Sequence, residues 1–98
     1  MSFKRINCHD IPRILENKNS LLIDIRDNHS FQISHIEEAQ HIDSIDLNTL
    51  SSQEDKDFPI VIYCYHGHSS LSAANFFCEK GFTNVYSLDG GYAAWVGQ

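Results

Sequence analysis

A cysteine at the end of an apolar run is the residue best suited to chemistry in this sequence. Cys64 follows Ile60-Val61-Ile62-Tyr63, which predicts a buried strand opened by Pro59. A short segment with Gly67 comes next, and a helical pattern begins at Ser70. A loop bent between a strand and a helix can aim several backbone N–H groups at one point, and the new helix adds its positive dipole end. We therefore expect Cys64 to be a thiolate nucleophile that can hold an extra sulfur as a persulfide anion, with no metal or organic cofactor.

The rest of the chain supplies the elements that must position this cysteine. Apolar runs predict strands over 3–6, 21–25, 60–64 and 85–88. Helical patterns cover 11–17, 27–33, 46–50 and 70–80, and a last helical turn follows Gly90-Gly91. We expect Asp10 to cap the first helix and Gly81 to end the fourth. This alternation predicts an α/β fold of three layers, with a mainly parallel sheet flanked by helices on both faces.

Length and composition indicate the number of domains and argue against several classes of function. The 98 residues predict one domain over 1–98. The net charge of −6, with the seven Lys and Arg scattered, argues against nucleic acid as a partner. No apolar run approaches the roughly 20 residues of a membrane span. The first ten residues lack the pattern of a signal peptide, so the sequence predicts a cytoplasmic location.

The other two cysteines are predicted to have no role in the chemistry. An odd count of three and the lack of an export signal argue against a disulfide framework. Cys78 follows Phe77 on the apolar face of a predicted helix, which is typical of a core position. Cys8 lies near a helix start beside His9, and we expect an incidental, exposed surface thiol there.

Four motifs together resemble a known family. They are Leu22-Ile23-Asp24-Ile25-Arg26-Asp27, Phe31 with Ser34-His35-Ile36 and Ala39, the segment Cys64-Tyr65-His66-Gly67-His68-Ser69-Ser70, and Leu88-Asp89-Gly90-Gly91-Tyr92-Ala93-Ala94-Trp95. In this order they are similar to the single-domain rhodaneses, and specifically to the GlpE-type thiosulfate sulfurtransferases. Each motif alone is weak, but the four in sequence cover nearly the whole chain.

The resemblance implies a two-step sulfur transfer. The Cys64 thiolate attacks the outer sulfur of thiosulfate, and sulfite leaves. Another sulfane-sulfur donor would transfer its outer sulfur in the same way and release its own leaving group. Cyanide or a thiol acceptor, such as a thioredoxin-like protein, then removes the sulfur. The resemblance implies that Asp24 and Arg26 form an ion pair that ties down loops. The segment that binds the persulfide is expected to comprise Tyr65, His66, Gly67, His68, Ser69 and Ser70, with the amides of 65–69 around the outer sulfur.

The sequence departs from the family pattern in three places. Ser34 stands where the family usually has Gly, and residues 40–43 lack the usual x-N-I-P; we expect both changes to affect a surface turn. The loop has no Arg or Lys, so His66 and His68 are its only potential cations. Thiosulfate binding is therefore expected to be weak or pH-dependent.

Other functions are less well supported by the residues. A tyrosine phosphatase needs Arg six residues after the Cys to clamp phosphate, and this position is Ser70. A thioredoxin-type oxidoreductase needs a C-x-x-C motif, which is absent. Cys64, His66 and His68 alternate as metal ligands could, but no fourth ligand lies nearby in sequence, and we expect no metal site. A persulfide carrier or interaction module that receives sulfur from a partner protein remains an open alternative.

Overall fold

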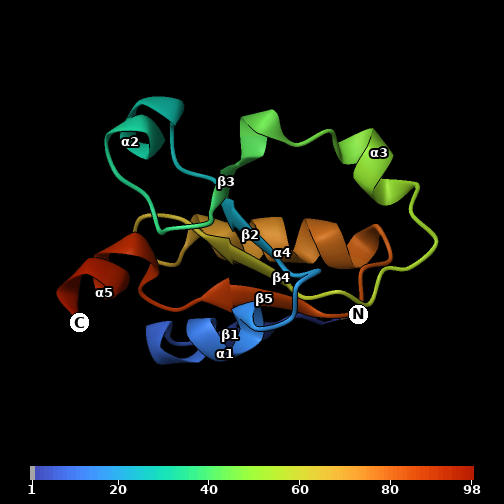
Figure 1. Cartoon of the computed structure of the whole chain (residues 1–98), viewed down its shortest axis with the longest axis horizontal. Helices are drawn as coiled ribbons and strands as arrows, with labels where there is room; N and C mark the ends of the chain where they lie inside the picture. Colours follow the sequence, from blue (N-terminus) through green and yellow to red (C-terminus); the bar gives the residue numbers. More distant parts are fainter. Residues whose placement is uncertain (1) are drawn as a thin grey trace.

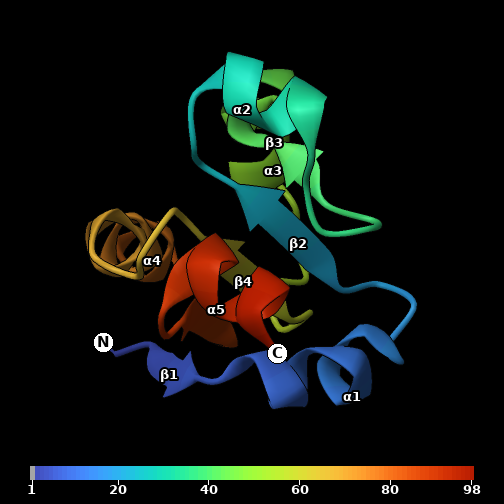
Figure 2. The same cartoon turned by 90° about the vertical axis from the view of Figure 1, so that its left-hand side faces the viewer.

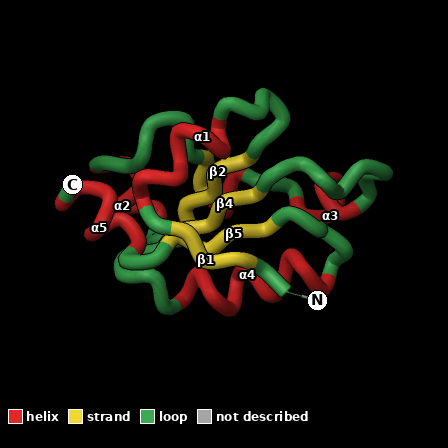
Figure 3. Tube along the Cα trace, turned by 90° about the horizontal axis from the view of Figure 1, so that it is seen from below, coloured by secondary structure: helices red, strands yellow, loops and turns green. Residues whose placement is uncertain are grey.

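Five parallel strands form the centre of the molecule. The structure is a computed structural model, and it describes residues 2–98. The strands are β1 (Lys4–Ile6), β2 (Leu21–Asp24), β3 (Gln40–His41), β4 (Ile60–Tyr63) and β5 (Val85–Leu88), in the order β1-β5-β4-β2-β3. Every neighbouring pair is parallel, so the predicted parallel sheet is confirmed (Figure 3). β4, which leads to Cys64, is the middle strand.

Helices cover both faces of this sheet, as the sequence predicts. They are α1 (Ile11–Leu15), α2 (Asn28–Ile33), α3 (Leu47–Ser51), α4 (Ser69–Glu79) and α5 (Gly91–Gly97), with short 3-10 turns η1 (Cys8–Asp10) and η2 (Ile42–Ser44). Figure 3 shows α1 and α4 on opposite sides of the strands. Within the described residues, none of the helices is long and apolar enough to cross a membrane.

The alternation of side chains along β4 builds two apolar layers. Ile60 and Ile62 join the layer under α4, which includes Ala74 and Phe77. The residues between them, Val61 and Tyr63, belong to the opposite layer with α1 and α5. All four strand residues are buried, as expected for a central parallel strand that is covered on both faces. The strand end before Cys64 is therefore held rigidly from both sides.

Several local expectations were wrong. β3 was not predicted, because Gln40 and His41 carry no apolar pattern. Asp10 makes no side-chain cap to α1; Asn7 accepts a hydrogen bond from the His9 amide (2.9 Å) at the start of η1, and its own amide donates to Asp10 (3.2 Å). The capped unit is thus the 3-10 turn before α1. The helix predicted over 11–17 ends at Leu15, where the chain tightens into 3-10 bonds.

The carboxyl ends of the strands gather at one end of the molecule. Figures 1 and 2 show α2, α5 and the loop after β4 at this end, while α3 lies toward the other. In parallel α/β sheets the crevice beyond these strand ends is the usual place for a ligand site. The motifs singled out from the sequence therefore converge at the expected edge.

Candidate active site

Two backbone amides point at the sulfur of Cys64. Cys64 directly follows β4. Its Sγ accepts hydrogen bonds from the amide of Gly67 (3.2 Å) and from the amide of Ser70 (3.3 Å). The residue is only 5% exposed, so the sulfur lies at the floor of the loop. The loop thus provides the donors expected around a sulfur anion, in a site with little access to water.

The surroundings of Cys64 favour its thiolate. Burial is the largest single influence, and it raises the pKa of the thiol. Hydrogen bonds from the Ser70 hydroxyl, the Ser70 amide and the amides of Gly67 and His66 act in the opposite direction. Together they outweigh burial, so the pKa of Cys64 lies below its ordinary value. A lowered thiol pKa is what a nucleophilic cysteine needs.

Glycine is required at the bend of the loop. Gly67 has φ of 91°, and a Cβ there would lie 2.8 Å from the backbone nitrogen of Gly90. The start of α5 also presses on the loop, since a Cβ on Gly91 would lie 2.5 Å from the carbonyl oxygen of Cys64. The amide of Tyr92 donates to that same oxygen (2.8 Å). The motif around Gly90 and Gly91 therefore holds the loop after Cys64 in shape.

Two buried serine hydroxyls lie behind the sulfur. Ser70, the second residue of α4, is fully buried, and its Oγ is 3.5 Å from the Cys64 Sγ. The same Oγ is 2.8 Å from the Oγ of Ser87 on β5, which is also fully buried. The sequence analysis missed Ser87. Its signal was a polar residue on the strand face shared with Val85, where an apolar residue is expected.

A buried ion pair occupies the end of β2, next to β4. Asp24 is fully buried, and Arg26 is 6% exposed. Arg26 donates to the Asp24 carboxylate through Nη2 (2.7 Å), Nε (3.0 Å) and its backbone amide (2.8 Å). Burial lowers the pKa of Arg26, but the hydrogen bond and charge of Asp24 outweigh it, so the pKa is raised. The predicted ion pair is confirmed, and its charges are fully engaged.

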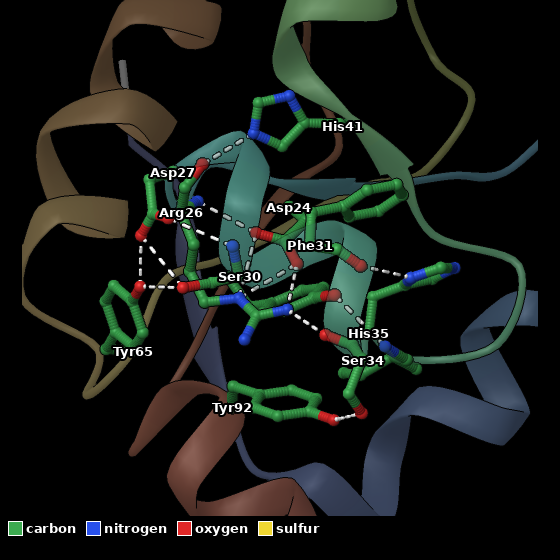
Figure 4. A network of polar contacts seen from close by, with 12 residues as sticks. Asp24, Arg26, Asp27, Ser30, Phe31, Ser34, His35, His41, Tyr65 and Tyr92 are labelled. Atoms are coloured by element: carbon green, nitrogen blue, oxygen red, sulfur yellow. Dashed lines mark hydrogen bonds and ion pairs between the residues drawn. The ribbon is translucent and has the colours of Figure 1, made fainter.

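Further contacts fix the guanidinium of Arg26 in place (Figure 4). Its Nη2 donates to the carbonyl of Ser34 (2.6 Å), and its plane lies over the ring of Tyr92, 4.0 Å from the ring centre. The Ser34 hydroxyl bonds to the Tyr92 hydroxyl. Ser34 is exposed, as expected for a surface turn, and it also joins α2 to α5 through these contacts. His41, another buried residue, places Nε2 2.5 Å from the Arg26 carbonyl oxygen.

Tyr65, the first residue after Cys64, is bound to α2. The hydroxyl of Tyr65 donates to the carboxylate of Asp27, the N-cap of α2, and bonds to the Ser30 hydroxyl (Figure 4). The bond from Tyr65 is the largest cause that lowers the pKa of Asp27, to about 2. Tyr65 is 44% exposed and reaches Asp27 across the molecular surface. The loop is therefore anchored to its neighbours on both sides.

The remaining candidate residues differ in their exposure to solvent. His66, His68 and Ser69 are exposed. Cys78 is buried in the layer under α4, as predicted. Cys8, expected to be exposed, is instead buried (7% exposed) and packs with Ile11 in the opposite layer. Within the part of the chain that the structure describes, no three His, Cys, Asp or Glu side chains are grouped closely enough to hold a metal ion.

Comparison with known proteins places this geometry in a family. The model of the Rhodanese-like domain family matches residues 8–98. The chain belongs to the rhodanese-like domain family. Solved structures agree with this fold. A rhodanese-like domain from Anabaena sp. superposes with a TM-score of 0.77 at 27% identity, over 99% of this chain and 75% of that one. A human single-domain sulfurtransferase has a TM-score of 0.75 at 17% identity, over 96% of both chains, and supports the fold alone.

Curated relatives are more similar in sequence than these structures. The protein named Thiosulfate sulfurtransferase GlpE of Shewanella oneidensis is 44% identical over 94 residues, which is 96% of this chain and 93% of that protein. The protein of the same name from Pseudomonas aeruginosa is 43% identical, over 96% of this chain and 84% of the relative. The resemblance stated from the four motifs is thus confirmed over nearly the whole rhodanese-like chain.

Proposed function

We propose that this protein is a thiosulfate sulfurtransferase in which Cys64 carries the sulfur. The observation that carries the proposal is the pair of amide donors, from Gly67 and Ser70, on the Cys64 Sγ. They favour an anionic sulfur without any metal or organic group. The relatives named thiosulfate sulfurtransferase support the choice of donor.

The reaction proceeds in two displacements. The Cys64 thiolate attacks the outer sulfur of thiosulfate, the S–S bond of thiosulfate breaks, and sulfite leaves with the bonding electron pair. Cys64 then bears a terminal sulfur anion. Cyanide or a thiolate attacks this outer sulfur, which gives thiocyanate or an acceptor persulfide, and the Cys64 thiolate is restored. The lowered pKa of Cys64 favours the thiolate that attacks in the first step.

The segment 65–70 binds the persulfide in this proposal. The amides of 65–69 face the outer sulfur, and the exposed His66 and His68 lie at the mouth of the loop, where a sulfur donor arrives. The unit that acts is the single rhodanese domain of residues 1–98. A thiol protein such as a thioredoxin-like one serves as acceptor, and the predicted setting is the cytoplasm.

Steady-state turnover of thiosulfate and cyanide to thiocyanate tests this function. Cys64→Ala is expected to abolish turnover and to keep the far-UV and near-UV circular dichroism of the native fold. Cys8→Ala is the matched control, since it removes a buried thiol far from the loop in sequence, and turnover should remain. Turnover that persists in Cys64→Ala, or a folded Cys8→Ala protein without turnover, would overturn the assignment.

A persulfide carrier that is loaded by a partner protein is the second candidate. The observation that favours it is the absence of any Lys or Arg in 64–70, which leaves thiosulfate without a fixed cation there. Loading of Cys64 by a protein persulfide, together with no loading by thiosulfate, would support the carrier over the enzyme.

A further inference from the structure

The hydroxyl of Ser87 is a polar group that the packing of the core does not explain. Ser87 faces the layer under α4, opposite Ile62 in the strand register, and it is fully buried. A hydroxyl moved from water to such a layer costs free energy unless it is hydrogen-bonded. Among the described residues, its one side-chain hydrogen bond is to the Oγ of Ser70, at 2.8 Å. An apolar side chain would fill the same space without this requirement.

This hydroxyl belongs to a line of three atoms that ends at the reactive sulfur. The Ser87 Oγ is bonded to the Ser70 Oγ, which lies 3.5 Å from the Cys64 Sγ. The three residues come from β5, the start of α4 and the end of β4, so the fold brings them together from separate segments. A hydroxyl donates one hydrogen and accepts others, so its direction in such a line can reverse.

The charge of the sulfur decides that direction. In the thiol form, the Cys64 S–H donates to Ser70, whose hydrogen points at Ser87. In the thiolate form, the sulfur only accepts, so Ser70 must turn its hydrogen toward Cys64. Its oxygen is then free to accept from Ser87. Each serine keeps its own proton, only the hydroxyl hydrogens rotate, and the proton lost by the thiol goes to solvent.

We propose that Ser87 is a positioning residue for sulfur transfer: by donating to the Ser70 oxygen, it orients the Ser70 hydroxyl to donate to the anionic sulfur of Cys64. This role rests on the proposed function of Cys64 and extends it by one buried residue outside the loop. Donors in a line polarise one another, so the Ser70 bond to the sulfur is stronger with Ser87 behind it.

The titratable side chains near this line are exposed or bonded to other partners. Tyr65, His66 and His68 of the loop are exposed, and Asp89, two residues beyond Ser87, is paired with Arg5 (2.7 Å). Tyr92 of α5 is bonded to Ser34. A change in the titration of Cys64 on loss of the Ser87 hydroxyl is therefore attributable to the serine pair.

The test is the pH dependence of Cys64 alkylation by iodoacetamide, mapped by peptide mass so that Cys8 and Cys78 do not contribute. Ser87→Ala is expected to raise the apparent pKa of Cys64 by about 0.5 to 1, the size of one ordinary hydrogen bond, because Ser87 bonds to Ser70 and not to the charged sulfur itself. Alkylation below the pKa should slow by about three- to tenfold. Ser72→Ala, an exposed serine on the same helix, is the matched control and should leave the profile unchanged.

A double-mutant cycle separates positioning from a general structural effect. In a Ser70→Ala background, the further change Ser87→Ala should leave the Cys64 profile unchanged, because Ser87 acts only through Ser70. An equal rise with and without the Ser70 hydroxyl would overturn the proposal, as would an unchanged profile in Ser87→Ala alone. If Ser87→Ala does not fold, Ser87→Cys replaces it; its weaker donor should give a smaller rise of the same sign.

This readout is independent of turnover. A protein that fails to move sulfur from thiosulfate but shows the Ser87 effect on Cys64 alkylation would refute the proposed function and leave the positioning role intact. If the wild type turns over thiosulfate but Ser87→Ala leaves the Cys64 alkylation profile unchanged, the proposed function stands and the positioning role is refuted.

Discussion

The ends of β2 and β4 are neighbours in the sheet, yet they handle charge in opposite ways. At the end of β2, the negative Asp24 and the positive Arg26 are both buried and bond to each other. At the end of β4, the groups bonded to the Cys64 sulfur are neutral: it accepts from the amides of Gly67 and Ser70, and the Ser70 hydroxyl lies 3.5 Å away. The charges of Asp24 and Arg26 balance each other, whereas the surroundings of Cys64 can stabilise a negative charge.

The difference teaches what each site can do. A buried ion pair with complete hydrogen bonding is costly to disturb and offers nothing to a ligand, so the β2 site is structural. The neutral donors around Cys64 have no anionic partner of their own. They can therefore stabilise the negative charge of a thiolate or of the proposed persulfide. The β2 site is nevertheless connected to the β4 site. Arg26 contacts the Ser34 carbonyl and the Tyr92 ring, and the Tyr92 amide donates to the carbonyl of Cys64.

Breaking the ion pair is expected to have the largest effect on stability. Asp24→Asn leaves the Arg26 charge buried without its partner, which should lower the free energy of unfolding by about 3–5 kcal/mol. Urea unfolding measures this. Arg5→Gln is the matched control, since it breaks the exposed pair of Arg5 and Asp89, and its effect should stay below about 1 kcal/mol. Equal effects of the two variants would contradict the structural role of the β2 site.

Distorting the loop whose amides donate to the Cys64 sulfur should affect sulfur transfer more than stability. Gly67→Ala places a Cβ against the backbone of Gly90, so the loop must shift, and sulfur transfer should fall by about 100-fold. Gly81→Ala is the control: its φ of 98° is equally unfavourable for Ala, but the new Cβ meets only the Lys56 side chain at 3.4 Å. Similar losses of turnover in both variants would show that the close fit at Gly67 is unimportant.

Serine substitution of two buried cysteines sharpens the contrast between a site with donors and a core without them. Cys78→Ser puts a hydroxyl among apolar side chains, which should cost about 1–3 kcal/mol of stability while sulfur transfer is kept. In Cys64→Ser, the new hydroxyl meets the Gly67 and Ser70 amides, so stability should change by less than about 1 kcal/mol while transfer is lost. Thermal unfolding and turnover report both. The reverse order of stabilities would contradict this account.

The smallest effect is expected at the link between the loop and α2. Tyr65→Phe removes the largest cause that lowers the pKa of Asp27, so this pKa should rise from about 2 toward its ordinary 3.8. Since the folded pKa is the lower one, Asp27 stabilises the fold above about pH 4, and this contribution is lost as the pH falls toward 2. Carbon NMR of the Asp27 carboxyl group measures the titration. Tyr86→Phe is the control, and a wild-type Asp27 that titrates near 3.8 would contradict the link.

The sequence predicted the parts of the molecule that depend on local pattern. The apolar runs placed β2, β4 and β5 to within a residue at each end, and the helical pattern over 27–33 predicted α2. The position of Cys64 between a strand and a glycine loop was enough to predict amides around its sulfur. These features follow from neighbours in the chain, which a single sequence contains.

Contacts between distant segments could not be predicted in this way. Ser87 lies seventeen residues from Ser70 in sequence, and only the packing of α4 against β5 brings the two hydroxyls together. Cys8 was expected at the surface, because it lies near a helix start beside His9, yet the 3-10 turn rotates it into the layer that includes Ile11. The role of Ser34 likewise depends on Arg26 and Tyr92, which come from two other elements.

The most direct test of the central claim is the mass of the intact protein after brief exposure to thiosulfate, followed by peptide mapping under non-reducing conditions. The account predicts a gain of one sulfur atom, about 32 Da, on the peptide that contains Cys64, and its removal by cyanide. Sulfur added to Cys8 or Cys78 instead, or no addition while thiocyanate is being formed, would contradict it.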